Sequence, residues 1–386
     1  MDVERLKAKD CKELVAFLDE VFTLQNGHQM DFAGIFPRIF QEDNEKMGWY
    51  YAVKEDGKII GTAASHPFTY RVGDETLKVS AGGNVAVSPN CRNRGIMQTL
   101  LHRINEDLEA EGFDFAYLHG DRKRYRTFGF EKGGTEYLMY FTRSMLKKEN
   151  CTADVTLHDM RQETESVLDA VMAIADAQVS GFRRTKEEFL PAMIASKRQP
   201  LVIRRDSQVV GYLSLDVPGA YLAELGLKDP EDLGSVLAAV AEYIGGSGTL
   251  VIRLPAYEAA LVRRAITISG RYNIIQPANF KILRLGNVLR VFLKAKRLYA
   301  PLMDGRLTID SELLGKWTVS CKAGEVSVLP GEGEVDIRLP GYRVYEFLFG
   351  PNDPFLAEAD TAKLPPEKAL LAANWFPLPL YCPHLS

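Results

Sequence analysis

The segment that most constrains this chain is residues 79–97, in which a predicted strand passes through a short basic loop into a predicted helix. Residues 79–87 (VSAGGNVAV) are a strand candidate, and Pro89 helps to end the strand because proline cannot donate to a ladder. From Gly95 onward a helical stripe follows, made by Met97, Leu100, Leu101, Ile104 and Leu108. The first N–H groups of a helix are free, and its dipole favours negative charge there. The segment therefore predicts a binding site for a pyrophosphate.

The elements around this segment predict a mixed α/β sheet. Residues 11–24 have apolar side chains at helical spacing, and residues 50–53 and 59–65 are strand-like runs separated by an Asp-Gly hairpin signal. Gly112 is a helix stop, and a further strand is predicted at 113–118. The order of helix, antiparallel strands and then strand–loop–helix–strand is typical of such a sheet.

An internal repeat follows the first unit. Residues 51–63 (YAVKEDGKIIGTA) and 201–213 (LVIRRDSQVVGYL) share the positions of apolar, charged and glycine residues, and Gly61 matches Gly211 at an offset of 211 − 61 = 150. Residues 225–230 precede an apolar helix at 236–244, as 85–89 precede the helix after Gly95. The second copy has carboxylates at Asp229, Glu231 and Asp232, which would repel a pyrophosphate, so we expect a structural role for it.

The C-terminal part differs in character. Residues 287–296 predict a short helix, and strand-like runs with turn signals at 304–305, 322–324 and 330–331 follow. The tail is rich in proline, but its apolar side chains, including Trp375, Phe376 and residues 378–381, gain by burial. We therefore expect the tail to pack inside the protein.

Composition narrows the class of protein. At 386 residues, two or three domains are expected. The formal net charge of -4 disfavours a nucleic-acid partner. The cysteines are scattered and form no C-x-x-C pair, which indicates free thiols and no metal site. No signal peptide and no apolar run long enough to span a bilayer is present in the sequence, so we expect no membrane association and a cytoplasmic location.

Two motifs in the first unit resemble those of the GNAT acetyltransferases. The pattern V-x-V-x-P-x-x-R-x-x-G-[IL] is matched by Val85, Val87, Pro89, Arg92, Gly95 and Ile96, and Met97 departs from the small residue often found next. The resemblance implies acetyl-CoA as co-substrate, bound by Val85, Ala86, Val87, Arg92, Asn93, Arg94, Gly95, Ile96 and Met97. The second motif, Y-x-x-[FLM]-G-F, is matched by Tyr125, Phe128, Gly129 and Phe130 and implies that Tyr125 donates a proton or a hydrogen bond to the departing thiolate. A packing role in the core is the alternative for Tyr125.

The whole-chain layout resembles the enhanced intracellular survival (Eis) family. This resemblance implies an active GNAT domain at 1–148, a second GNAT-like domain without the pyrophosphate loop at 149–284, and a domain at 285–386 similar to a sterol carrier protein, with its tail reaching the active site. It also implies that the C-terminal carboxylate of Ser386 is the general base, and that the protein forms a homo-oligomer such as a hexamer. None of the six histidines has a pairing motif that would make it the base, although His119 is a candidate for the wall of the site.

The resemblance implies transfer of an acetyl group to a primary amine, either of a small molecule similar to an aminoglycoside or polyamine, or of a lysine. Two alternatives stay open: transfer of a longer acyl group, and a lipid or small-molecule carrier that merely binds CoA. The basic run 122–126 is either a site for the 3′-phosphate of the cofactor, a solvated turn, or a surface that faces the acceptor.

Overall fold

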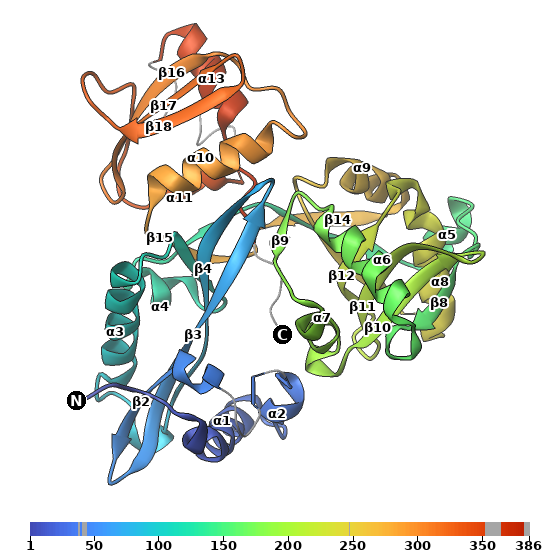
Figure 1. Ribbon diagram of the computed structural model, residues 1–386, viewed down its shortest axis with the longest axis horizontal. Coiled ribbons are helices and arrows are strands. Elements are labelled where there is room, and N and C mark those ends of the chain that lie inside the picture. The colour runs from blue at the N-terminus through green and yellow to red at the C-terminus, as the bar shows by residue number, and fades with distance from the viewer. Residues whose placement is uncertain (38, 41–44, 247, 352–363, 382–386) are drawn as a thin grey trace.

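The computed structural model describes residues 1–37, 39–40, 45–246, 248–351 and 364–381, and the fold contains three β-sheets (Figure 1). The first sheet has eight strands in the order β1-β2-β3-β4-β5-β15-β6, with β9 paired to β3. Its strands are β1 (Glu4–Arg5), β2 (Tyr50–Glu55), β3 (Lys58–Val72), β4 (Glu75–Val87), β5 (Phe115–Leu118), β6 (Glu131–Gly133), β9 (Ser180–Phe182) and β15 (Ala278–Ile282). The mixed α/β sheet predicted for the first unit is confirmed.

Helices cover both faces of the first sheet. They are α1 (Cys11–Asn26), α2 (Phe32–Ile35), α3 (Ile96–Ala110) and α4 (Arg122–Arg126). Leu14, Leu18 and Val21 of α1 are buried against β2 and β3, as their spacing predicts. Leu100, Leu101 and Ile104 of α3 are buried in a separate cluster with residues of β2 and β5. The predicted helices at 11–24 and after Gly95 are therefore confirmed.

The second sheet has seven strands in the order β14-β7-β13-β12-β11-β10-β8. They are β7 (Glu136–Phe141), β8 (Thr156–Asp159), β10 (Gln199–Arg205), β11 (Gln208–Asp216), β12 (Tyr221–Leu227), β13 (Leu250–Pro255) and β14 (Arg271–Ile275). The helices of this unit are α5 (Arg143–Lys148), α6 (Glu165–Asp176), α7 (Lys186–Met193), α8 (Leu233–Ile244) and α9 (Ala259–Ile268). The hairpin β10–β11 and the helix α8 lie where the repeat places them.

The first two units exchange strands. β7 precedes the predicted boundary at residue 148, yet it pairs with β13 in the second sheet. β15 precedes the predicted boundary at residue 284, yet it pairs with β5 and β6 in the first sheet. β9 of the second unit runs antiparallel to β3 at the junction (Figure 1). The two units are thus joined through their sheets as well as through the chain.

The third unit has a four-stranded sheet, β18-β17-β16-β19, with three described helices. The elements are β16 (Gly305–Ser311), β17 (Gly315–Lys322), β18 (Glu325–Pro330), β19 (Ile337–Leu339), α10 (Leu285–Lys296), α11 (Arg343–Phe349) and α13 (Pro366–Trp375). Side chains of α10 and α11 share one buried cluster with β3, β4 and β5, which joins this unit to the first sheet. Trp375, Phe376, Leu378 and Leu380 are buried, so the expected packing of the tail is confirmed for the described part.

Cys11, Cys91, Cys151 and Cys321 are free thiols, as expected for the four cysteines that the structure describes. Within those same described ranges, no helix combines the length and the apolar character that crossing a membrane requires.

Candidate active site

The candidate site lies where two parallel strands of the first sheet separate. β4 pairs with β5 from Val79 to Gly82, and β5 ends at Leu118, opposite Gly82. β4 continues to Val87, paired on its other side with β3. The register between β3 and β4 shifts near Asn84, whose φ of 50° is in the left-handed region. The strand edge from 83 to 87 therefore turns away from β5, and its backbone groups face the opening between the strands.

One polar contact braces this irregular part of β4. Asn84 donates a hydrogen bond through Nδ2 to the hydroxyl of Tyr50 at 2.7 Å, and Tyr50 is completely buried. Burial raises the pKa of Tyr50, so its hydroxyl stays neutral. The separation of the strands is thus fixed by a buried contact with β2, which the sequence motif did not indicate.

The loop after β4 adopts the geometry that the motif predicts. Asn93 and Gly95 have φ values of 63° and 76°, and Gly95 is the residue that precedes the first turn of α3. A side chain at Gly95 would be strained in this conformation, and a Cβ there would meet only Gln98 Oε1, at 3.3 Å. The first intrahelical bond runs from Thr99 N to Gly95 O. The amides of the first turn before Thr99 therefore lack an acceptor within the helix and are available to an anion.

The two arginines of the loop differ in their environment. Arg94 pairs with Glu55 of the β2–β3 hairpin, with hydrogen bonds of 2.6 and 3.2 Å. This partner raises the pKa of Arg94 and lowers the pKa of Glu55, through the hydrogen bond first and the charge second. Arg92 is exposed and forms no ion pair with any described residue. Arg92 is therefore the guanidinium of the loop with its charge uncompensated.

Tyr125 lies on α4, the helix that follows β5. Its side chain is 7% exposed and packs with Phe128 and Phe130. A Cβ added to Gly120 would lie 2.8 Å from the Tyr125 ring, so glycine is required there for the ring to sit in place. Burial raises the pKa of Tyr125, which keeps the hydroxyl protonated at neutral pH. No hydrogen bond of this hydroxyl to another described residue is present, and the proton is available to a ligand.

Within the basic run 122–126, two arginines form ion pairs with a buried carboxylate and two basic side chains face solvent. Arg122 and Arg126 both pair with Glu131, whose side chain is only 4% exposed. Arg126 also lies over the ring of Tyr342, with its guanidinium carbon 4.3 Å from the centroid, and accepts a 2.6 Å hydrogen bond from Tyr342 through its carbonyl oxygen. These two arginines therefore hold α4 to β6 and to the third unit. Lys123 and Arg124 are exposed.

His119 follows β5 directly and lies at the border with the second unit. Desolvation lowers its pKa to about 4, although the side chain keeps solvent-exposed surface, and the positive charges of Lys132 and Arg253 add to this effect. The imidazole is thus neutral at physiological pH. Its ring contacts Tyr117 edge-on, with centroids 6.3 Å apart.

The tail runs from the third unit to the junction of the first two. Lys296 donates hydrogen bonds to the carbonyl oxygens of Trp375 and Pro377, at 3.0 and 3.3 Å. Tyr70 of β3 donates to the carbonyl oxygen of Tyr381 at 2.9 Å, and the Tyr381 ring meets Tyr257 of the second unit. Ser386, the predicted base, lies outside the described residues.

Comparison with known proteins agrees with this geometry. Residues 2–133 match the family model described as an acetyltransferase (GNAT) domain. A search of curated proteins found no match. A GCN5-related N-acetyltransferase from Kribbella flavida is similar in structure, with a TM-score of 0.67, 14% identity and 100% of both chains covered. One from Anabaena variabilis has a TM-score of 0.70 at 13% identity, covering 99% of this chain and 98% of its own.

The family match defines residues 2–133 as a GNAT acetyltransferase domain, which supports acetyl-CoA-dependent N-acetyl transfer by this part of the chain. Eis1 from Mycobacterium abscessus is also similar, with a TM-score of 0.63 and 14% identity over 98% of this chain and 99% of that one. Over its whole length the chain therefore has the Eis-type fold.

Proposed function

We propose that this enzyme moves an acetyl group from acetyl-CoA to a primary amine of a small molecule, similar to an aminoglycoside or polyamine, or to a lysine. The observation that carries the proposal is the opening between β4 and β5, which has a free strand edge on one side and a helix N-terminus at its end. This arrangement matches the two ends of the co-substrate, a thioester and a diphosphate. Arg92, Asn93, Arg94, Gly95, Ile96 and Met97 would surround the diphosphate.

The backbone at Val85, Ala86 and Val87 would hold the thioester. Its amides that face the opening are suited to hydrogen-bond the carbonyl oxygen as negative charge develops there. The amine nitrogen attacks the carbonyl carbon, and the tetrahedral species then breaks its C–S bond to give the amide and a thiolate. The departing thiolate accepts a proton or a hydrogen bond from the hydroxyl of Tyr125. Burial raises the pKa of this hydroxyl, so it keeps its proton in the free enzyme and is suited to donate a hydrogen bond to the thiolate.

The attacking amine must first lose a proton, and the Eis resemblance assigns this step to the carboxylate of Ser386. Five residues follow the described tail position Tyr381 and can span at most about 18 Å. Tyr70, which binds the Tyr381 carbonyl oxygen, is five residues along β3 from Ser65, and Ser65 pairs with Gly82 where β4 and β5 separate. The length of the remaining chain is thus compatible with the role, which supports the proposal.

The experiment is a thiol-release assay with acetyl-CoA and a panel of primary amines. We expect thiol release that requires an amine and a mass increase of the amine by one acetyl group. A preference for a long-chain acyl-CoA would favour the longer-acyl alternative. If no amine is acetylated while CoA still binds, the carrier alternative replaces the proposal. A tag appended after Ser386 should also abolish turnover, and full activity of the tagged enzyme would remove the carboxylate from the mechanism.

Several features implied by the Eis resemblance stay predictions. They are the division into domains at 1–148, 149–284 and 285–386, the similarity of the third domain to a sterol carrier protein, the homo-oligomer or hexamer, and the cytoplasmic location.

A further inference from the structure

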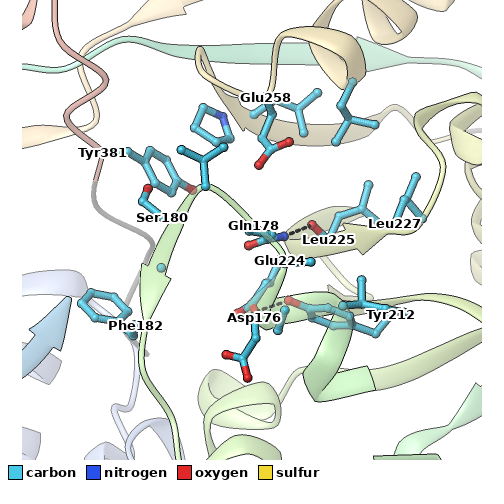
Figure 2. A pocket seen from close by; sticks show the side chains of 18 of the residues that line it. Asp176, Gln178, Ser180, Phe182, Tyr212, Glu224, Leu225, Leu227, Glu258 and Tyr381 are labelled. Atoms are coloured by element: carbon cyan, nitrogen blue, oxygen red, sulfur yellow. Dashed lines mark hydrogen bonds between the residues drawn. The ribbon is translucent and has the colours of Figure 1, made fainter. Parts of the chain in front are cut away.

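The second unit contains a cavity at the place that corresponds to the active-site opening of the first. β12 and β13 run parallel and pair only at Tyr221–Val251 and Leu222–Ile252, after which they separate. A cavity of about 520 Å³ lies between them, and α6, β9 and Tyr381 of the tail also line it (Figure 2). Its volume is in the range of sites for small molecules.

The cavity cannot take the cofactor of the first unit. Before α8, the Asp229 carboxylate accepts a 2.9 Å hydrogen bond from the amide of Glu231, which occupies one of the N–H groups that a diphosphate would use. Glu231 and Asp232 add two further carboxylates, paired with Arg264 at 3.2 Å and Arg205 at 2.7 Å. In the second unit β12 and β13 separate as β4 and β5 do in the first, but the carboxylates of the loop before α8 disfavour binding of an anion.

Two of the three positive side chains that line the cavity are already paired, and the third, Lys228, is exposed to solvent. Arg184 binds Glu224 through two hydrogen bonds of 2.9 and 3.0 Å. Arg253 lies 3.7 Å from Glu136, a carboxylate with a side chain only 1% exposed. An anionic ligand would have to compete with these carboxylates. The cavity therefore disfavours a carboxylate or phosphate ligand.

Two carboxylates that line the cavity, Glu258 and Asp176, are not paired with an arginine or lysine that the structure describes. Glu258 accepts a hydrogen bond from the backbone of Val179. Figure 2 shows the Glu258 carboxylate directed into the space beside Tyr381 and Leu225. Asp176 is exposed, so Glu258, which is half-buried and whose pKa is raised by burial, is the uncompensated carboxylate that faces the cavity. The aromatic ring of Tyr381 lies on the same wall.

We propose that this cavity is a second binding site, for an organic cation with an apolar body such as an arylalkylamine. The ammonium group binds the Glu258 carboxylate, because a charge-assisted hydrogen bond is stronger than a neutral one. The apolar body packs against Leu225 and the rings of Tyr257 and Tyr381, whose faces also attract a cation. The site is separate from the acetyl-CoA opening and does not rest on the proposed acetyl transfer.

The test uses tryptamine and its neutral analogue tryptophol, titrated into the full-length protein by calorimetry in saturating CoA. We expect tryptamine to bind at least about tenfold more tightly than tryptophol, because only tryptamine carries the ammonium group. Glu258→Gln should weaken tryptamine about tenfold and leave tryptophol unchanged. The matched control is Glu242→Gln, an exposed carboxylate outside the cavity, which should change neither affinity.

Folding of each variant is checked by its affinity for CoA, which the substitution at residue 258 should not alter. Equal affinity for tryptamine and tryptophol, or tryptamine binding that Glu258→Gln leaves intact, would overturn the proposal. So would competition between tryptamine and CoA in a titration repeated without saturating CoA, because competition would place the amine in the first opening. Failure of this test would leave acetyl transfer by the first domain untouched.

Discussion

The first two units of this protein have the same strand geometry but opposite charges where the strands meet the next helix. In the first unit Glu55 of the hairpin pairs with Arg94 of the loop. In the second unit the equivalent hairpin position, Arg205 (205 − 55 = 150), pairs with Asp232. Each unit therefore ties its hairpin to its loop with an ion pair, and the sign of the loop is reversed. Strand separation alone makes a cavity, and the charge of the loop decides which ligand can use it.

The largest effect is expected from giving the first loop the charge of the second. Gly95→Asp would place a carboxylate next to the bound diphosphate, and charges about 4 Å apart near a protein surface repel by about 4 kcal/mol. We expect roughly a thousandfold loss of CoA affinity, measured by calorimetry. Gly95→Asn is the matched control, because it causes the same strain at φ 76° without the charge. Equal losses in the two variants would assign the effect to the backbone.

The second prediction compares a buried tyrosine from each unit. Tyr125→Phe should lower turnover about a hundredfold while CoA affinity stays nearly unchanged, because it removes only the proton donor. Tyr257→Phe is the comparison, since this hydroxyl donates to the Ser180 carbonyl oxygen at 3.3 Å in the second unit. It should leave turnover within about threefold. Steady-state rates of thiol release measure both, and unchanged turnover in Tyr125→Phe would assign that residue to packing.

Features made by residues close together in the sequence could be predicted, whereas features made by distant residues could not. The loop around Gly95 could be predicted because strand, turn and helix are contiguous and each has a local signal. The Asp-Gly hairpin and its repeat at 205–208 were predictable for the same reason. The exchange of β7 and β15 was not, because a strand carries no local mark of the sheet that it joins.

The same limit applies inside the site. Asn84 meets Tyr50, and Arg122 and Arg126 converge on Glu131, through contacts that only the folded chain creates. A sequence shows the charges of the basic run but not their partners. Likewise, the second unit was expected to be only structural from its loop carboxylates. Its cavity depends on strand separation, which has no sequence signal.

The third prediction concerns the border between the two units, where Arg253 lies near His119 on one side and Glu136 on the other. Burial raises the pKa of Glu136 from 4.5 to about 7. The folded protein therefore holds this proton more tightly than the unfolded chain, and Glu136 costs stability increasingly as pH rises from 4.5 to 7. Glu136→Gln removes this cost. It should raise the free energy of unfolding by about 2 kcal/mol more at pH 8 than at pH 5.

Urea denaturation at the two pH values measures this difference. His119 also titrates, since its pKa is lowered to about 4 from 6.5, but its contribution is present in both proteins and cancels in the comparison of variant with wild type. A variant with the same pH dependence as the wild type would show that Glu136 is ionised in the folded state at pH 5.

The smallest change in CoA affinity is expected from breaking the ion pair between hairpin and loop, which is Glu55–Arg94 in the first unit and Arg205–Asp232, with the charges exchanged, in the second. Glu55→Gln leaves Arg94 without its partner, so the guanidinium can turn toward the diphosphate. We expect CoA affinity to rise about threefold at low ionic strength and this gain to shrink as salt screens the exposed charges. Arg205→Gln is the matched control, because it breaks the equivalent pair in the second unit and should leave CoA affinity unchanged. Calorimetric titrations at two salt concentrations distinguish these results. A fall in affinity with Glu55→Gln would mean that Glu55 holds Arg94 in its binding position, and the pair in the first unit would then be part of the site.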